Sequence, residues 1–154
     1  RDRSVSRGLG DVYKRQGVDF MLYKINIHTG RGDQMIDITG KVQESVKESG
    51  VNSGLCTVYV PHTTCGLTIN ENADPDVQSD ILMTLDRLVP YDDPNFHHYE
   101  GNSAAHIKSG LFGFSQNIII ENGRLLLGTW QGIYLCEFER VKTSRTVYVK
   151  IMEG

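Results

Sequence analysis

The segment NIIIENGRLLLGTWQGIYLCEFE, which spans residues 117–139, decides the fold class of this chain. Apolar residues at 118–120 lead into the pair Asn122-Gly123, and leucines resume at 125–127. An Asn-Gly pair between two such runs favours the positive φ angles of a tight turn. The segment therefore predicts a β-hairpin, with a further strand after the link GTWQG.

The chain on either side of this segment also has strand patterns. Downstream, residues 145–152 alternate between apolar and polar. Upstream, the same alternation predicts strands at 23–28 and 34–38, which we expect to form a hairpin. Residues 55–60 and 67–70 are rich in β-branched and apolar side chains, as strands are. Most of the chain therefore has β character.

Helices are predicted between these strands. Residues 39–49 have helical apolar spacing, and Asp74 is a typical N-cap with Pro75 at the first helical position. A short helix is expected to start at Asn102 or Ser103. Strands in pairs with two or three inserted helices favour an α+β fold over a parallel α/β fold. We therefore expect one domain with a mixed, mostly antiparallel sheet.

The composition is that of a soluble globular domain. The chain has 154 residues, of which 39% are hydrophobic and 23% charged. A chain of this length and composition can bury one hydrophobic core without disulfides or structural metals. No apolar run approaches the roughly 18 residues of a membrane span, and no leader pattern is present. We expect a cytoplasmic protein that binds no membrane and, because its net charge is −3, no nucleic acid.

Residues 1–20 differ from the rest of the chain. They have no helical or strand period, and the first ordered pattern begins at Met21. The segment SRGLGDVYKRQ within them resembles translated sequencing-adapter read-through. We expect residues 1–20 to be a non-native or disordered extension and residues 21–154 to form the domain. The alternative is a genuine basic arm that could contact nucleic acid, although the acidic body would oppose the binding of a polyanion.

The three cysteines do not form a recognisable disulfide or zinc pattern. They are odd in number and include no CxxC pair. We expect Cys56 and Cys136, inside apolar runs, to be buried free thiols. Cys65 has a second interpretation, because it shares a loop with His62.

Four of the five histidines lie within 45 residues, at His62, His97, His98 and His106. Imidazoles bind metals and transfer protons near neutral pH, so this stretch predicts a polar pocket. Three interpretations stay open. The imidazoles could bind a divalent metal, could satisfy buried hydrogen bonds, or could bind a phosphate without metal.

Three blocks of sequence carry a resemblance to a known family. They are HTTCGLTINENADPDVQSD from His62, HHYEGNSAAHIKSGLFG from His97 and GRLLLGTWQGIYLCEFE from Gly123. In order and spacing they resemble the YjbQ-like family, often labelled secondary thiamine-phosphate synthase, over residues 21–154. The resemblance implies a small α+β domain, a homotrimer, and a pocket at or near the subunit interface that binds a divalent metal, zinc or magnesium.

The resemblance also assigns roles to individual residues. The third histidine of the family pattern falls on His97 or His98, and we favour His98 because it stands three residues before Gly101. The implied metal ligands are then His62, His98 and His106. The implied catalytic residues are His62, Glu71, His106 and Lys108. The implied substrate-binding residues are Thr63, Asn102, Ser103, Thr129, Trp130 and Gln131.

These residue types suit thiamine-phosphate formation, which joins a pyrimidine pyrophosphate to a thiazole phosphate. Lys108 and the helix N-terminus at Asn102-Ser103 could bind phosphate oxygens, and Trp130 could stack on a flat ring. Glu71 suits acid/base catalysis or the orientation of an imidazole. Trp130 could equally pack in the core or at an interface. Two function classes follow: a metal-assisted enzyme on a small phosphorylated substrate, or a trimeric binding or regulatory protein without turnover.

Overall fold

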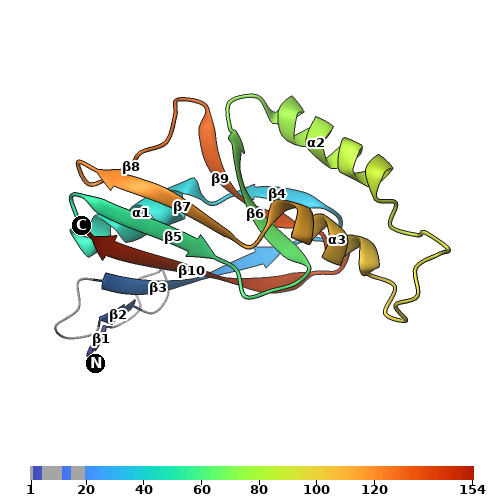
Figure 1. Cartoon of the computed structure of the whole chain (residues 1–154), viewed down its shortest axis with the longest axis horizontal. Coiled ribbons are helices and arrows are strands. Elements are labelled where there is room, and N and C mark those ends of the chain that lie inside the picture. Colours follow the sequence, from blue (N-terminus) through green and yellow to red (C-terminus); the bar gives the residue numbers. More distant parts are fainter. Residues whose placement is uncertain (1, 5–11, 15–19) are drawn as a thin grey trace.

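A computed structural model describes residues 2–4, 12–14 and 20–154 of the chain. These residues form two β-sheets and three helices, and every strand pair is antiparallel (Figure 1). The predicted α+β class is therefore confirmed. None of the three helices has both the length and the apolar content needed to cross a membrane.

The elements have the following bounds. The helices are α1 (Thr39–Ser49), α2 (Pro75–Leu88) and α3 (Ser103–Phe112). The strands are β1 (Asp2–Ser4), β2 (Val12–Lys14), β3 (Phe20–Thr29), β4 (Gln34–Asp37), β5 (Gly54–Tyr59), β6 (Cys65–Glu71), β7 (Ser115–Glu121), β8 (Arg124–Leu125), β9 (Gln131–Glu137) and β10 (Thr143–Glu153).

Strands from the C-terminal part of the chain occupy the middle of both sheets. The larger sheet has the order β1-β2-β3-β10-β5-β7-β8, and the smaller has the order β4-β9-β6. The predicted hairpin between residues 23–28 and 34–38 is wrong, because β3 pairs with β10 while β4 pairs with β9 in the other sheet. Residues 30–33 therefore carry the chain from one sheet to the other.

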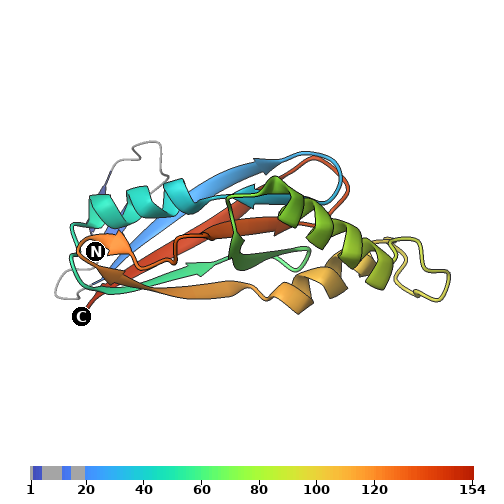
Figure 2. The same ribbon diagram turned by 90° about the horizontal axis from the view of Figure 1, so that it is seen from above.

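The main hydrophobic core lies between the larger sheet on one side and the smaller sheet with α1 on the other (Figure 2). Alternate residues of each strand point into it, as the period of two requires. Val147, Val149 and Ile151 of β10 are fully buried there, as are Ile133 and Leu135 of β9.

A second, smaller cluster lies on the other face of the smaller sheet, where α2 and α3 cover it. It contains Tyr134, Cys136 and Phe138, which stand two residues apart along the chain and share one face. α3 lies close to β6 at Gly66, where an added Cβ would stand 2.8 Å from the carbonyl oxygen of Gly113. This glycine allows the helix to approach the sheet.

Local signals for helix ends and turns are confirmed. Asp74 accepts a hydrogen bond from the N–H of Asp76 over 2.9 Å and caps α2, with Pro75 in the first turn. The hairpin of β7 and β8 turns at Asn122 and Gly123, both of which have positive φ. The prediction for residues 1–20 falls largely outside the described residues and stays a prediction.

Candidate functional site

His62 lies just beyond the end of β5, where strand pairing stops. Tyr59 stands opposite Tyr148 in the last β5–β10 pair, so Pro61 would face Thr146 if pairing continued. Proline has no N–H to donate to such a ladder. The backbone N–H of Thr146 instead donates to Nε2 of His62 over 2.9 Å. The imidazole thus accepts a backbone hydrogen bond at the strand end.

A buried ion pair lies next to this contact. Arg145, which is 6% exposed, donates through Nε to Oε1 of Glu137 over 2.6 Å and through Nη2 to Oε2. The same Nη2 donates to Oγ1 of Thr64 over 2.8 Å. The hydroxyl of Thr29 donates to Oε1 of Glu137 over 2.8 Å. Both charges are therefore satisfied inside the fold.

These surroundings favour a neutral His62. Burial lowers the pKa of His62 below its ordinary value, and the positive charge of Arg145 lowers it further, against a smaller opposing effect of Glu137. Burial alone would also lower the pKa of Arg145, but its hydrogen bonds to Glu137 and nearby charges outweigh this and raise it. Arg145 therefore stays charged beside an uncharged imidazole.

The cysteines are not activated. All three are buried free thiols, and burial raises the pKa of Cys56, Cys65 and Cys136 to about 12. A thiol with such a pKa stays protonated at neutral pH and is a poor nucleophile. The prediction of buried thiols is confirmed for Cys56 and Cys136, and Cys65 has the same character.

The N-terminus of α3 has an unusual cap. Asn102 occupies the N-cap position, but its side chain makes no capping hydrogen bond. Its Nδ2 donates to Oε2 of Glu139 over 3.1 Å, and its Oδ1 is buried without a partner in the described part of the chain. The first-turn amides of α3 therefore lack a side-chain acceptor, and a buried acceptor without a partner lies beside them.

Two of the predicted metal ligands lie side by side at this helix. The rings of His98 and His106 have centroids 5.7 Å apart and meet edge to face at 82°. Nε2 of His98 lies 3.6 Å from Oε1 of Glu100. Among residues 21–154 no group of three histidine, cysteine or carboxylate side chains is placed to hold a metal. A single chain thus does not bring His62 to this pair as a third ligand.

Lys108 is fully buried and already paired. Its Nζ donates to Oδ2 of Asp33 over 2.8 Å and lies 3.4 Å from Oδ1 of Asp86. Arg140 donates to the same two carboxylates. The network joins α3 and α2 to the link between β3 and β4. A catalytic role for Lys108 stays a prediction, and it would require the ammonium to leave these carboxylates.

Residues 128–132 (GTWQG) contact residues 70–72 (NEN) of the same chain. Glu71 stands opposite Gln131 in the β6–β9 pair, and the N–H of Asn72 donates to the carbonyl oxygen of Trp130 over 2.9 Å. Trp130 is 63% exposed, and Thr129 is exposed as well. The indole is therefore not a core residue of the single chain, and it is free to meet a ligand or another copy.

The predicted residues thus fall into three groups. The first group lies at the end of β5 and consists of His62 and Thr63. The second lies at the start of α3 and consists of His98, Asn102, Ser103 and His106. The third lies where β6 meets β9 and consists of Glu71, Thr129, Trp130 and Gln131. Lys108 lies apart, inside the ion network.

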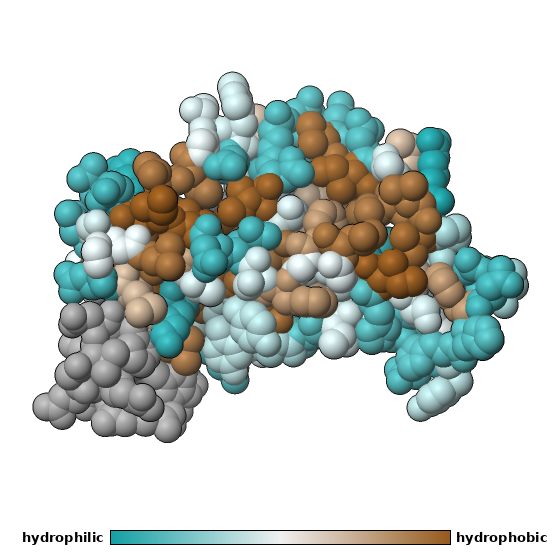
Figure 3. All heavy atoms as spheres, viewed as in Figure 1, coloured by the Kyte–Doolittle hydropathy of each residue, from teal (hydrophilic) through white to brown (hydrophobic). Residues whose placement is uncertain are grey.

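Apolar side chains gather in two places on the face shown in Figure 3, over α2 with α3 and near β7 and β8. Between α2 and α3 lies a hollow of about 400 Å³. It is lined by Asn70, Val77, Asp80, Ile81, Thr84, Leu85 and Phe112. No side chain of α2 itself is buried. This helix has an apolar stripe that the single chain leaves partly open.

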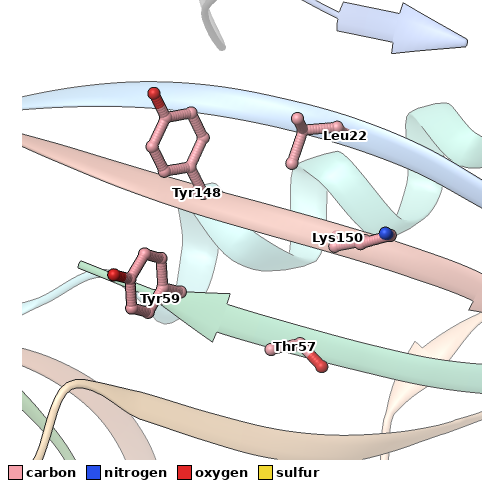
Figure 4. A pocket seen from close by; sticks show the side chains of 5 residues that line it. All are labelled: Leu22, Thr57, Tyr59, Tyr148 and Lys150. Carbon is pink, nitrogen blue, oxygen red and sulfur yellow. The ribbon is translucent and has the colours of Figure 1, made fainter. Parts of the chain in front are cut away.

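A second hollow of about 400 Å³ lies on the open face of the larger sheet (Figure 4). It is lined by Leu22, Thr57, Tyr59, Tyr148 and Lys150, which come from β3, β5 and β10. None of these five residues was predicted as a site residue.

The buried pair of Arg145 and Glu137 is not among the residues predicted from the sequence. A signal for it exists. Arg145 precedes Val147 and Val149 at spacings of two, and Glu137 follows Leu135 in the same way. A charge of each sign at the inward position of two strands indicates a buried ion pair.

The family described as UPF0047 protein YjbQ-like matches residues 23–154. The UPF0047 protein YugU of Bacillus subtilis is 53% identical over 132 residues, which cover 86% of this chain and 99% of that protein. The UPF0047 protein MJ1081 of Methanocaldococcus jannaschii is 52% identical, covering 86% of this chain and 94% of that protein.

Solved structures show the same fold. An uncharacterised YjbQ/UPF0047 protein of Clostridium acetobutylicum is 55% identical, with a TM-score of 0.81, over 84% of this chain and 98% of that one. A protein of unknown function from Sulfolobus solfataricus is 26% identical, with a TM-score of 0.79, over 88% and 99%. The chain belongs to the UPF0047 family of YjbQ-like proteins.

Proposed function

We propose that this protein is an enzyme that acts on a small phosphorylated or pyrophosphorylated substrate bound at the N-terminus of α3. The observation that carries the proposal is the cap of this helix. Asn102 leaves the first-turn amides without a side-chain acceptor, and its own Oδ1 is buried without a partner among the described residues. A buried polar atom without a partner is costly unless a ligand satisfies it.

A phosphate suits the helix start for electrostatic reasons. Amide N–H groups at a helix N-terminus point at the ligand, and the helix dipole favours negative charge there. Oδ1 of Asn102 is an acceptor and would take a hydrogen bond from a hydroxyl or amino group of the same substrate. His106, four positions from Asn102, adds an imidazole at the same end of α3.

A divalent metal is part of this proposal, but one chain supplies only some of its ligands. His98 and His106 offer two adjacent imidazoles with Glu100 nearby, which are suitable donors for zinc. Residues 21–154 of one chain do not complete a three-histidine site, so a further ligand would have to come from a neighbouring copy. We therefore place the pocket at an interface in a homotrimer. When bound, the metal would supply a Lewis acid for phosphate oxygens.

Thiamine-phosphate synthesis is the specific activity that the family resemblance implies. The exposed indole of Trp130, held beside Asn72 by a backbone hydrogen bond, is a suitable surface for a pyrimidine ring. Glu71, opposite the neighbouring Gln131, is the carboxylate that would move a proton there. We place this activity in the cytoplasm, where buried free thiols stay reduced.

The test is turnover by the trimer with pyrimidine pyrophosphate and thiazole phosphate. The protein is purified without chelator or affinity-tag metal, its metal content is measured, and its mass is checked by light scattering. We expect His106→Ala and His98→Ala to abolish product formation without dissociating the trimer. His97→Ala is the matched control and should keep activity. Equal activity in all three variants would refute the proposal.

The second candidate is a trimeric binding or regulatory protein. One observation favours it: Lys108, the predicted catalytic cation, is enclosed by Asp33 and Asp86. Such a protein would show ligand-dependent thermal stabilisation but no product. The two candidates are separated by adding pyrimidine pyrophosphate and thiazole phosphate, which react to thiamine phosphate with release of pyrophosphate, and by measuring melting temperature and product in the same samples.

A further inference from the structure

His62 has one ring nitrogen in use. The N–H of Thr146 donates to Nε2 over 2.9 Å, two residues beyond the last pair of β10 with β5. A backbone N–H is only a donor, so Nε2 must offer its lone pair. Nε2 therefore carries no proton in this arrangement.

The proton of the neutral ring must then be on Nδ1. A neutral imidazole has one N–H and one acceptor nitrogen, and the partner of one nitrogen determines the state of the other. Nδ1 makes no hydrogen bond to the described residues and is not one of the buried atoms left without a partner. It is accordingly an accessible donor.

The loop that carries the ring is fixed by further contacts. Thr64, two residues along, accepts a hydrogen bond from Arg145, and Arg145 is fixed by Glu137 and precedes Thr146 in β10. The loop that carries His62 is thus tied to the same strand that supplies the amide. The direction of Nδ1–H is set by the fold.

We propose that His62 presents an Nδ1–H donor to an acceptor oxygen of the ligand, such as a phosphate oxygen, and does not ligate a metal. Only the choice of phosphate rests on the function proposed above. The matching donor in the same loop is Thr63, whose side chain is exposed.

Metal ligation would conflict with the bond from Thr146. A histidine that binds metal through one nitrogen usually donates the other N–H to a carboxylate or carbonyl. Ligation through Nδ1 would put a proton on Nε2, facing the N–H of Thr146. Ligation through Nε2 would leave that amide without its acceptor. Either choice costs a hydrogen bond that the fold has already formed.

The tautomer is tested directly by nitrogen NMR on the full chain labelled in histidine, with the His62 signals assigned by comparison with His62→Gln. We expect Nδ1 to show the pyrrole-type signal of a protonated nitrogen and Nε2 the pyridine-type signal of an acceptor. Added zinc should leave both signals in place. A protonated Nε2, or a zinc-induced shift of the His62 ring nitrogens, would overturn the proposal.

Two variants separate a donor from a ligand. In His62→Gln the amide can accept from Thr146 and still donate outward, but it is a poor metal ligand. In His62→Glu the carboxylate can accept and can bind metal, but it cannot donate. We expect His62→Gln to bind inorganic pyrophosphate nearly as wild type does. We expect His62→Glu to bind it about 10-fold to 100-fold more weakly, as loss of a charged hydrogen bond predicts.

Both variants are checked for unfolding temperature and zinc content. The donor role is supported if the zinc content of His62→Gln equals that of the wild type while His106→Gln loses its zinc. Loss of zinc in both, or equal pyrophosphate binding by His62→Gln and His62→Glu, refutes it. If the wild type binds no pyrophosphate, the proposed function fails, and the NMR result alone decides the state of His62.

Discussion

The two ends of the candidate site are built differently. At the His62 end, defined by His62, Thr64, Glu137, Arg145 and Thr146, the charged groups are buried and fully hydrogen-bonded between the sheets. At the α2–α3 end, defined by helices α2 and α3 and the loop 90–101 between them, α2 has no buried side chain. The loop extends beyond the rest of the molecule (Figure 2), and Tyr99 in it is 92% exposed.

This difference indicates which part of the site is formed by one chain alone. A group fixed by buried hydrogen bonds has its direction set before a ligand binds, so little conformational entropy is lost on binding. The α2–α3 end has an apolar hollow, an uncapped helix and a projecting loop, all of which gain contacts only from something outside the chain. Four predictions test the contrast, in order of expected effect.

Removal of one charge at the His62 end should have the largest effect. Glu137→Ala leaves the charge of Arg145 buried without a counter-charge, which should cost about 3–5 kcal/mol of stability. Urea unfolding followed by circular dichroism measures the loss. The double variant Glu137→Leu with Arg145→Met should recover most of it, because no unpaired charge remains. A loss below about 1 kcal/mol in the single variant would contradict a buried, paired network.

A matched pair of leucine truncations compares the two ends directly. Leu135 is fully buried in β9, and its replacement by alanine should lower the free energy of unfolding by about 2–5 kcal/mol. Leu88, in α2 and 70% exposed, should cost less than about 0.5 kcal/mol in the isolated chain. The same unfolding experiment measures both. A large loss for Leu88→Ala that depends on protein concentration would show that another copy covers α2.

Gly66→Ala should disturb the contact between β6 and α3. The added methyl would stand 2.8 Å from the carbonyl oxygen of Gly113, so the helix must shift, at a cost of about 1–3 kcal/mol. Gly110→Ala is the control, because nothing lies within 4 Å of its added Cβ, and alanine favours a helix interior by about 0.5–1 kcal/mol. Equal melting temperatures for the two variants would argue against close approach at Gly66.

The smallest effect is expected from acid at the α2–α3 end. Burial alone would raise the pKa of Asp86, but hydrogen bonds and charge from Lys108 and then Arg140 outweigh it and lower the pKa. The stabilisation is therefore present above the ordinary value of 3.8 and is lost as pH falls through the lowered pKa. Since Asp86 is half exposed, it should amount to less than about 1 kcal/mol. Asp86→Asn should flatten this part of the stability curve, and an unchanged curve would count against the ion network.

Much of the fold could be predicted from local sequence signals. Asp74 with Pro75 fixed the start of α2, and Asn122-Gly123 fixed the β7–β8 turn, because capping and positive φ depend on neighbouring residues alone. The hairpin expected between residues 23–28 and 34–38 was wrong. Alternation predicts that a segment is a strand but says nothing of its partner, and here the paired residues are at least 97 positions apart, as Asp37 and Tyr134 are.

The residues of the candidate site could be predicted from the sequence, but their positions relative to one another only in part. The sequence indicated His98 and His106, which the fold places together, and Glu71 with Gln131, which face each other across β6 and β9. It did not indicate that Lys108 is buried. Its carboxylate partners come from distant segments, and only the tertiary fold brings them to one ammonium.

The central position of β9 and β10 has a consequence for synthesis on the ribosome. β3 and β5 are joined only through β10, and β4 and β6 only through β9. Until residues 131–153 have left the ribosome, β3, β4, β5 and β6 therefore each lack at least one strand that pairs with them in the finished sheets, and they have free edges. Such edges invite pairing with other nascent chains, and contacts this distant in sequence form slowly. We expect the nascent protein to depend on chaperones until its last strand is free.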